Sequence, residues 1–169
     1  MASSANPKPK RADPDVSTAA DTGSETLALF TTLARTGLYL DALQRECLGE
    51  HGLAFTEYSV LRLLQRASKR RLAPSVLAEA IVCTTGAMTK LVDRLQRAGW
   101  VSREPDPDDR RGVLIRLEPA GNRAANAAAA TYQTGRERIL AQLSVRDAGK
   151  IHSGLERLLD VLETDRRNR

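Results

Sequence analysis

TTGAMTKLVDRLQRAGWVSREPDPDDRRGVLIRLEPAG, the stretch from Thr84 to Gly121, decides the fold of this chain. Its first part is typical of a helix, with Thr84 or Thr85 as the N-cap and Gly99 at the C′ position. The apolar residues of this helix recur at the spacing of one buried face: Met88, Leu91, Val92 and Leu95. Two strand-length runs, WVSREP and GVLIRLE, follow and are separated by DPDDRR. The stretch therefore predicts a helix and then a β-hairpin with a charged tip.

Two further helices are predicted before this stretch. Thr56 can cap the first, whose apolar set is Tyr58, Val60, Leu61, Leu63 and Leu64. A basic loop, RASKRRLAPS, then leads through Pro74 to Ser75, a second cap candidate, and to the short helix VLAEAIV. The order helix, helix, helix, strand, charged turn, strand is that of a winged helix-turn-helix, which we place at about residues 54–118.

Long helices flank this core. Ser24 can cap a helix that runs to about Gly49, and an Ala-rich helix follows Pro119 and runs to about Leu143. A last helix is expected from a capping-box pattern, Ser144-Val-Arg-Asp147. The predicted fold class is therefore mostly α with a small β-hairpin (α+β), with flanking helices at about 24–50 and 119–163.

Terminal helices that are apolar on more than one side need a partner, and a second copy of the chain is the simplest one. We therefore predict a homodimer. The residues that we expect to lie between the two chains are Leu27, Phe30, Ile151, Leu155, Leu158 and Leu162. Residues 1–23 hold three prolines and few large apolar side chains, so we predict a disordered tail there and a folded part at 24–169.

The composition excludes several classes of protein. The formal net charge is +5, which suits nucleic acid or an anionic membrane without proving either. The chain has two cysteines and two histidines, all isolated in sequence, so we expect no metal, no cofactor and no enzyme. It has neither an apolar run of membrane-spanning length nor a signal-peptide apolar region, and we expect a cytoplasmic protein with no membrane partner.

The predicted helix after Thr84 has the residue types that a DNA-recognition helix needs. Such a helix enters the major groove with small or hydrogen-bonding residues at its N-terminal turns and keeps its apolar stripe behind. Gly86 has no side chain, so a DNA backbone could approach closely there. The candidate contact residues on this face are Thr84, Thr85, Gly86, Ala87, Thr89 and Lys90. The alternative is an ordinary amphipathic helix with a polar N-terminus.

The charged tip of the hairpin adds a second candidate contact. Arg110 or Arg111 could place a guanidinium in the narrow, electronegative minor groove. Asp109 is near enough in sequence to hold that guanidinium in position, and Asp93 could face the hairpin and tie the helix to it. The alternative is a solvated Asp/Arg turn, in which surface ion pairs contribute little.

LAEAIVCTTGAMTKLVDRLQRAGWVSREPDPDDRRGVLIRLEPAG resembles the winged-helix core of the MarR family of bacterial transcriptional regulators. The family's pattern holds a Leu-Ala helix, a recognition helix with T-x-x-V/L-D-R-L-x-x-x-G, a D-x-R-R wing and an L-T-x-x-G exit. The close match covers roughly Ala54 to Gly121, the flanking helices resemble the family's dimerisation helices, and TTGAMTKLVDRL more loosely resembles the PecS-like branch. One departure is Glu118, where the family usually has the Thr that caps the following helix.

The resemblance implies a homodimeric repressor that binds an inverted-repeat operator in double-stranded DNA and is released by a small-molecule effector, aromatic or anionic. It implies an acid–base pair of Asp109 and Arg111 in the wing, and it places Asp93 and Arg94 where the family links helix to wing and to phosphate. Ser75 joins the candidate DNA contacts, and Tyr39 and His51 fall near the effector cleft of relatives.

Two alternatives stay open. A redox-responsive regulator of the same fold could use Cys83 beside the recognition helix, whereas Cys47 is not at the first-helix position of the peroxide-sensing branch. A winged-helix adaptor would bind protein in place of DNA.

Overall fold

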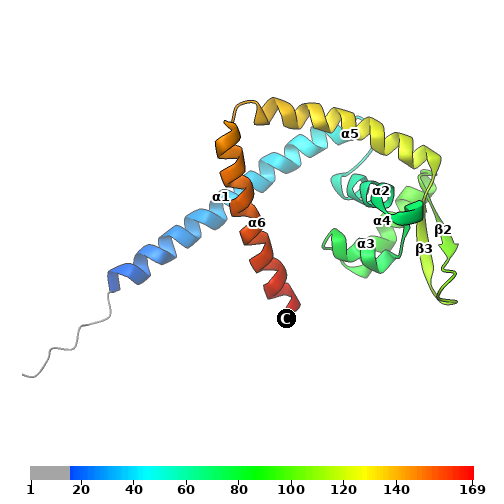
Figure 1. Cartoon of the computed structure of the whole chain (residues 1–169), viewed down its shortest axis with the longest axis horizontal. Helices are drawn as coiled ribbons and strands as arrows, with labels where there is room; N and C mark the ends of the chain where they lie inside the picture. Colours follow the sequence, from blue (N-terminus) through cyan, green and yellow to red (C-terminus); the bar gives the residue numbers. More distant parts are fainter. Residues whose placement is uncertain (1–15) are drawn as a thin grey trace, which may run out of the picture. The chain divides into compact units, whose positions relative to one another are not determined.

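The structure is a computed structural model and describes residues 16–169. The chain divides into two compact units, and the second unit begins at Asp41. It confirms the mostly helical fold with a small sheet (Figure 1). The elements are α1 (Val16–Gly49), α2 (Phe55–Arg66), the 3₁₀ turn η1 (Ser68–Arg70), β1 (Arg71–Leu72), α3 (Pro74–Ala80), α4 (Thr85–Arg97), β2 (Val101–Pro105), β3 (Val113–Leu117), α5 (Pro119–Leu140) and α6 (Val145–Arg167).

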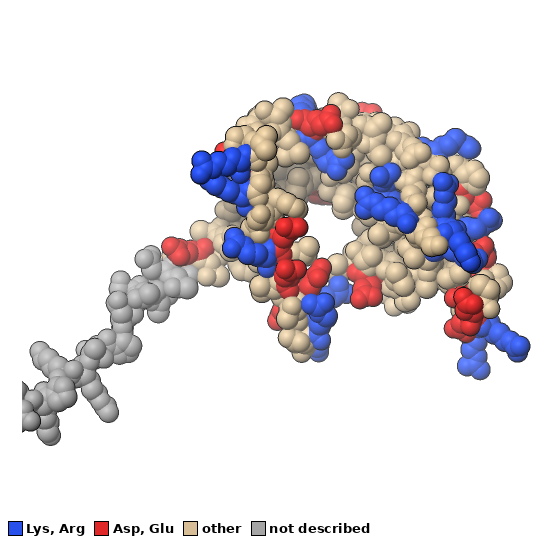
Figure 2. Space-filling view, viewed as in Figure 1, with Lys and Arg blue, Asp and Glu red and all other residues tan. Residues whose placement is uncertain are grey.

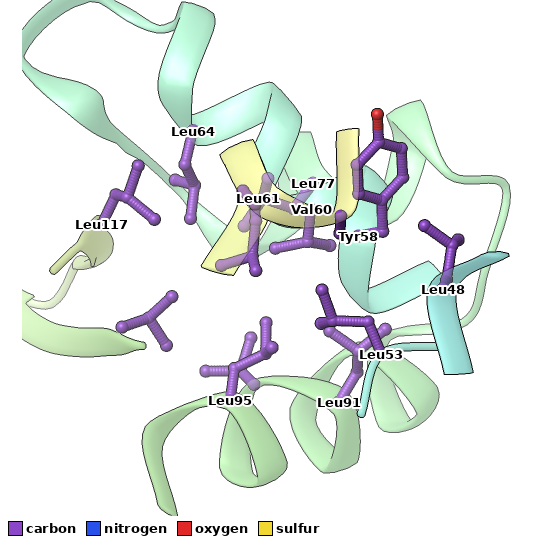
Figure 3. Packing of buried hydrophobic residues seen from close by; sticks show 14 of the residues in the cluster. Leu48, Leu53, Tyr58, Val60, Leu61, Leu64, Leu77, Leu91, Leu95 and Leu117 are labelled. Carbon is purple, nitrogen blue, oxygen red and sulfur yellow. The ribbon is translucent and has the colours of Figure 1, made fainter. Parts of the chain in front are cut away.

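One hydrophobic core holds α2, α3, α4 and the sheet together. The predicted stripe of α4, from Met88 to Leu95, is buried, and Figure 3 shows Leu91 and Leu95 directed towards Leu61 and Val60 of α2. Ala125 and Ala128 of α5 are also fully buried, and their small side chains let α5 lie close to α2. The spacing of apolar residues in the sequence therefore places them on the buried side of the winged helix-turn-helix.

The predicted hairpin is confirmed, and it belongs to a three-stranded antiparallel sheet in the order β1-β3-β2. Ile115 of β3 is opposite Arg103 of β2, and β1 pairs on the other side, where Leu72 is also opposite Ile115. The short strand β1 lies in the stretch that we predicted as a basic loop. Two residues are too few to show a period of two, so pairing with β3, and not local pattern, makes this strand.

The ends of α4 agree with the prediction, whereas three other predicted caps, Ser24, Thr56 and Ser75, are wrong, and Ser24 lies inside α1. The Thr84 hydroxyl accepts a hydrogen bond from Ala87 N at 3.2 Å, and Gly99 has φ +71° at the C-terminal end. Thr56 lies inside α2, which begins at Phe55 after the N-cap Ala54. Ser75 lies inside α3, because Pro74 takes the first helical position, where its missing N–H costs nothing.

The boundaries of the long helices are partly corrected. α1 begins at Val16, so residues 16–23 of the predicted disordered tail are helical, and residues 1–15 lie outside the described residues. The stretch that precedes Ser24 contains alanines of high helix propensity but no apolar period, and our prediction relied on the period. Ser144 caps α6 as predicted, since its Oγ accepts from Asp147 N at 3.1 Å; α6 then runs to Arg167, beyond the expected 163.

The first turn of α5 lies directly against the chain that enters the wing. Glu118 N donates to Trp100 O at 3.0 Å, and a Cβ on the buried Gly121 would come 2.2 Å from the same oxygen. The expected loss of the usual N-cap is confirmed, because the Glu118 side chain makes no cap hydrogen bond. Only glycine therefore fits at the point where α5 meets the wing.

Candidate nucleic-acid interface

The polar face of α4 is open to solvent. The buried stripe turns the opposite side of the helix outward, and all six candidate contact residues between Thr84 and Lys90 are exposed, whereas Met88 belongs to the buried stripe. A Cβ added to Gly86 would meet nothing within 4 Å, so this position faces open space. The Thr89 hydroxyl donates to Thr85 O at 3.0 Å. Ser75 is exposed in the first turn of α3.

An ion pair joins α4 to the hairpin. Asp93 Oδ1 lies 2.6 Å from an Arg103 terminal nitrogen, and Arg103 also donates to Gln96. Arg103 belongs to β2, below the tip. The structure therefore brings Asp93 to the hairpin at its stem.

The aspartates of the tip bind backbone and shape the turn. Asp109 Oδ1 accepts from Arg111 N at 2.9 Å, and Asp106 Oδ1 accepts from Asp108 N at 3.0 Å. The expected ion pair between Asp109 and the Arg111 guanidinium is absent from the part of the chain that the structure describes. A short aspartate side chain reaches the N–H two residues on more easily than a guanidinium at the end of a long side chain. Arg110 and Arg111 are exposed.

A set of ion pairs at the base of the wing was not predicted from the sequence. Glu104 binds Arg71 at 2.8 Å and Arg116 at 3.3 Å, and Glu118 binds Arg116 at 3.0 Å. The alternation of side chains along two adjacent strands could have indicated these pairs once the register was known. These ion pairs connect β1, β2 and β3 below the tip of the hairpin.

Figure 2 shows Lys and Arg side chains over the winged-helix part of the chain and at the tip of the hairpin, with acidic side chains beside them. Arg94 on α4 is exposed and has its Nε 3.1 Å from Glu57 Oε1. Lys90 makes no ion pair with the residues that the structure describes. On this face, Arg94 is therefore paired with a carboxylate, whereas Lys90 is not paired with any described residue.

A cavity of 610 Å³ lies between α2, α5 and the turn that joins α3 to α4. Phe55, Tyr58 and Tyr132 line it and pack ring to ring, with centroids 5.9 to 6.4 Å apart. Three arginines line it as well: Arg62, Arg66 and Arg136. The Arg136 guanidinium carbon lies 4.7 Å from the centre of the Tyr132 ring. The cavity therefore combines aromatic surface with positive charge.

The residues predicted for an effector do not line this cavity. His51 Nε2 lies 2.8 Å from the Thr131 hydroxyl, and Tyr39 is exposed on α1 in the other unit of the chain. The aromatic group of Phe55, Tyr58 and Tyr132 was not predicted from the sequence. The spacing of the first two on one face of α2 was a usable signal, but Tyr132 comes from a distant helix.

The two cysteines have different surroundings. Cys47 is buried, and burial together with the Glu46 carboxylate raises the pKa of its thiol, so the reactive thiolate is scarce at neutral pH. Cys83 is half-buried just before the Thr84 cap. Only Cys83 has the access that the redox alternative requires.

The predicted dimer residues are open in the single chain. Leu27, Phe30, Ile151, Leu155 and Leu162 are each about half exposed or more, and Leu158 is half-buried.

Within residues 16–169 no group of His, Cys, Asp and Glu side chains could hold a metal ion. Among the same residues, no single helix could cross a membrane by length and hydropathy, although the bent pair α3 and α4 passes that test.

Comparisons with known proteins agree with this geometry. The sequence profile of the MarR family matches residues 51–112. The regulator PecS of Dickeya dadantii is 26% identical over 147 residues, 86% of this chain and 89% of PecS. The repressor YetL of Bacillus subtilis is 30% identical over 115 residues, 68% of this chain and 69% of YetL. Both relatives are named as transcriptional regulators and not as enzymes.

A solved structure has the same fold. A mutant of MarR from Escherichia coli in complex with operator DNA superposes with a TM-score of 0.73 at 25% identity, over 80% of this chain and 96% of that one. The exposed polar face of α4 and the hairpin joined to it agree with the family that the sequence matches. This chain belongs to the MarR family of transcriptional regulators.

Proposed function

We propose that this protein is a homodimeric repressor that binds an operator in double-stranded DNA and is released from it by a small molecule. The observation that carries the proposal is the coupling of two exposed contact surfaces. The N-terminal turns of α4 face solvent, and the Asp93–Arg103 ion pair at 2.6 Å ties α4 to the wing. A recognition helix and a wing held in this way can engage adjacent grooves together. We also propose a cytoplasmic location, where such a regulator would meet its operator.

A two-fold dimer should bind an inverted repeat with half-sites about one helical turn, 10–10.5 bp, apart. The test is a gel shift with the DNA upstream of the protein's own gene, followed by footprinting. Symmetric protection of two half-sites supports the proposal. Failure to bind any duplex at low salt would point to the adaptor function, and a single asymmetric footprint would contradict the dimer.

Replacing Arg111 with alanine is expected to flatten the salt dependence of DNA binding. Each cationic side chain that neutralises DNA charge contributes about 0.9 to the slope of log K against log salt concentration. The variant dimer lacks two such side chains, so the slope should fall in magnitude by about 2. The fold should be retained, because the side chain is exposed. Fluorescence anisotropy at several salt concentrations measures the slope.

Arg146→Ala, which removes an exposed cation from α6, is the control and should leave the slope unchanged. A folded Arg111→Ala protein with the wild-type slope would show that the wing is a solvated turn.

The cavity beside the helix-turn-helix suits an aromatic anion. Its rings can stack on an aromatic ligand, and its arginines can bind a carboxylate in a fork geometry. The turn that closes it contains Val82, whose φ of +57° is unusual for a β-branched residue, so a ligand there would contact the backbone that sets the angle between α3 and α4. Aromatic carboxylates are therefore the proposed effectors.

Arg62→Ala should weaken binding of aromatic carboxylates by about 10- to 150-fold, since a hydrogen bond to a charged group contributes about 1.5–3 kcal/mol. Calorimetry with a panel of such acids, and with the matching neutral amides, measures this. Arg146→Ala should bind like the wild type. Acids and amides that bind equally, or acids that leave DNA affinity unchanged, would contradict an anionic effector.

A further inference from the structure

We propose that Glu57 is a positioning residue for DNA binding, which holds the guanidinium of Arg94 so that its terminal nitrogens are presented to the DNA backbone. This inference rests on the proposed function, because it requires that Arg94 contact DNA. Glu57 lies on α2, outside both the recognition helix and the wing.

The Glu57 carboxylate is fixed at both oxygens. Its side chain is only 11% exposed. Oε2 accepts a hydrogen bond from Ala54 N at 2.8 Å, which caps the start of α2, and Oε1 lies 3.1 Å from Arg94 Nε. The carboxylate is therefore anchored to the first turn of α2 and reaches across to α4.

Arg94 is held in a way that leaves its binding groups open. The ion pair is made at Nε, and the two terminal nitrogens make no hydrogen bond with the described residues. The side chain is 55% exposed. Two terminal N–H groups on a planar guanidinium match the oxygens of a phosphate, so a guanidinium anchored through Nε is preorganised for a bidentate contact.

The nearby arginines are held differently. Arg103 uses its terminal nitrogens for Asp93 and Gln96, and Arg97 donates its Nε to the Asp93 carbonyl, a backbone group, at 3.3 Å. Arg94 alone of these three combines a buried carboxylate at Nε with open terminal nitrogens. The cap on α2 needs only one neutral acceptor oxygen, so the negative charge of Glu57 serves Arg94.

Glu57→Gln separates the two roles, because the amide oxygen can still accept from Ala54 N while the charge is lost. An unanchored arginine must be ordered on binding, which weakens the operator complex by about 2- to 12-fold per subunit. The salt slope should stay at the wild-type value, because the cation still reaches the phosphate. Glu137→Gln on α5, which removes the same charge at an exposed site, is the control and should bind like the wild type.

A double-mutant cycle with Arg94→Ala tests whether Glu57 acts through Arg94. Arg94→Ala should flatten the salt slope by about 2 per dimer. Glu57→Gln should then cause no further loss in the Arg94→Ala background. An equal loss in both backgrounds, or wild-type affinity in Glu57→Gln itself, would overturn the inference. A wild-type protein that binds no duplex would instead refute the proposed function.

Arg94→Lys gives a second test that leaves α2 untouched. Lysine keeps the charge and the salt slope, but an ammonium bound to Glu57 has no second pair of coplanar donors to present. We expect a loss of affinity comparable to that of Glu57→Gln and no additional loss when both changes are combined. Wild-type affinity in Arg94→Lys would overturn the inference even if Glu57→Gln failed to fold.

Discussion

Replacing Gly121 with alanine is expected to lower the free energy of unfolding by about 3 kcal/mol or more, the upper end of the cost of overpacking. The added Cβ would lie 2.2 Å from Trp100 O and 2.9 Å from Trp100 C. Both are backbone atoms, so no side-chain rotation can relieve the clash. The shift would also strain the hydrogen bond from Glu118 N to Trp100 O.

Thermal unfolding should show this as a fall in Tm of about 6–12 °C for a chain of this size. Gly149→Ala is the matched control, because a Cβ there meets nothing within 4 Å and alanine favours a helix more than glycine does. We expect that control to be neutral or slightly stabilised. A Gly121→Ala protein that melts with the wild type would mean that α5 can move away from the wing at little cost.

Placing aspartate at both Leu155 and Leu162 should dissociate the proposed dimer and lower operator affinity by about 100-fold or more. Both leucines are about half exposed in the single chain, so the substitutions bury no charge in the monomer. In a dimer the same charges would be desolvated without partners. A monomer binds one half-site and loses the gain of about 10²–10⁴ that two linked sites provide.

Sedimentation at micromolar concentration and anisotropy with the operator measure the two effects separately, and circular dichroism checks that helix content is retained. A double variant that stays dimeric would contradict the role of α6. A wild-type chain that sediments as a stable monomer would contradict the dimer as a whole.

The parts of the fold that local pattern encodes could be predicted from sequence. The buried face of α4, the end of α4 at Gly99 and the two strands of the hairpin all follow from residue spacing and turn residues between Thr84 and Gly121. The strand β1 could not be predicted, because Arg71 and Leu72 become a strand only by pairing with Arg116 and Ile115.

The candidate site shows the same limit. The polar face of α4 follows from its buried face, and the structure bears out that Asp93 reaches the hairpin. The contact between Glu57 and Arg94 joins separate helices, and no pattern on either helix contains it. Asp109 was assigned to the wrong group of Arg111 because a sequence gives proximity along the chain but not the direction of a side chain. The roles of the contact and dimer residues remain predictions.

The order of the elements along the chain has a consequence during synthesis. The apolar residues Leu27 and Phe30 lie on the first helix, and Ile151 and Leu155 lie on the last, after the whole winged helix-turn-helix has been made. Domains fold from the N-terminus as the chain leaves the ribosome. A nascent or truncated chain that ends before Val145 therefore contains every candidate DNA contact but lacks α6. If the proposed dimer needs both terminal helices, we expect such a fragment neither to repress by itself nor to pair with an intact subunit.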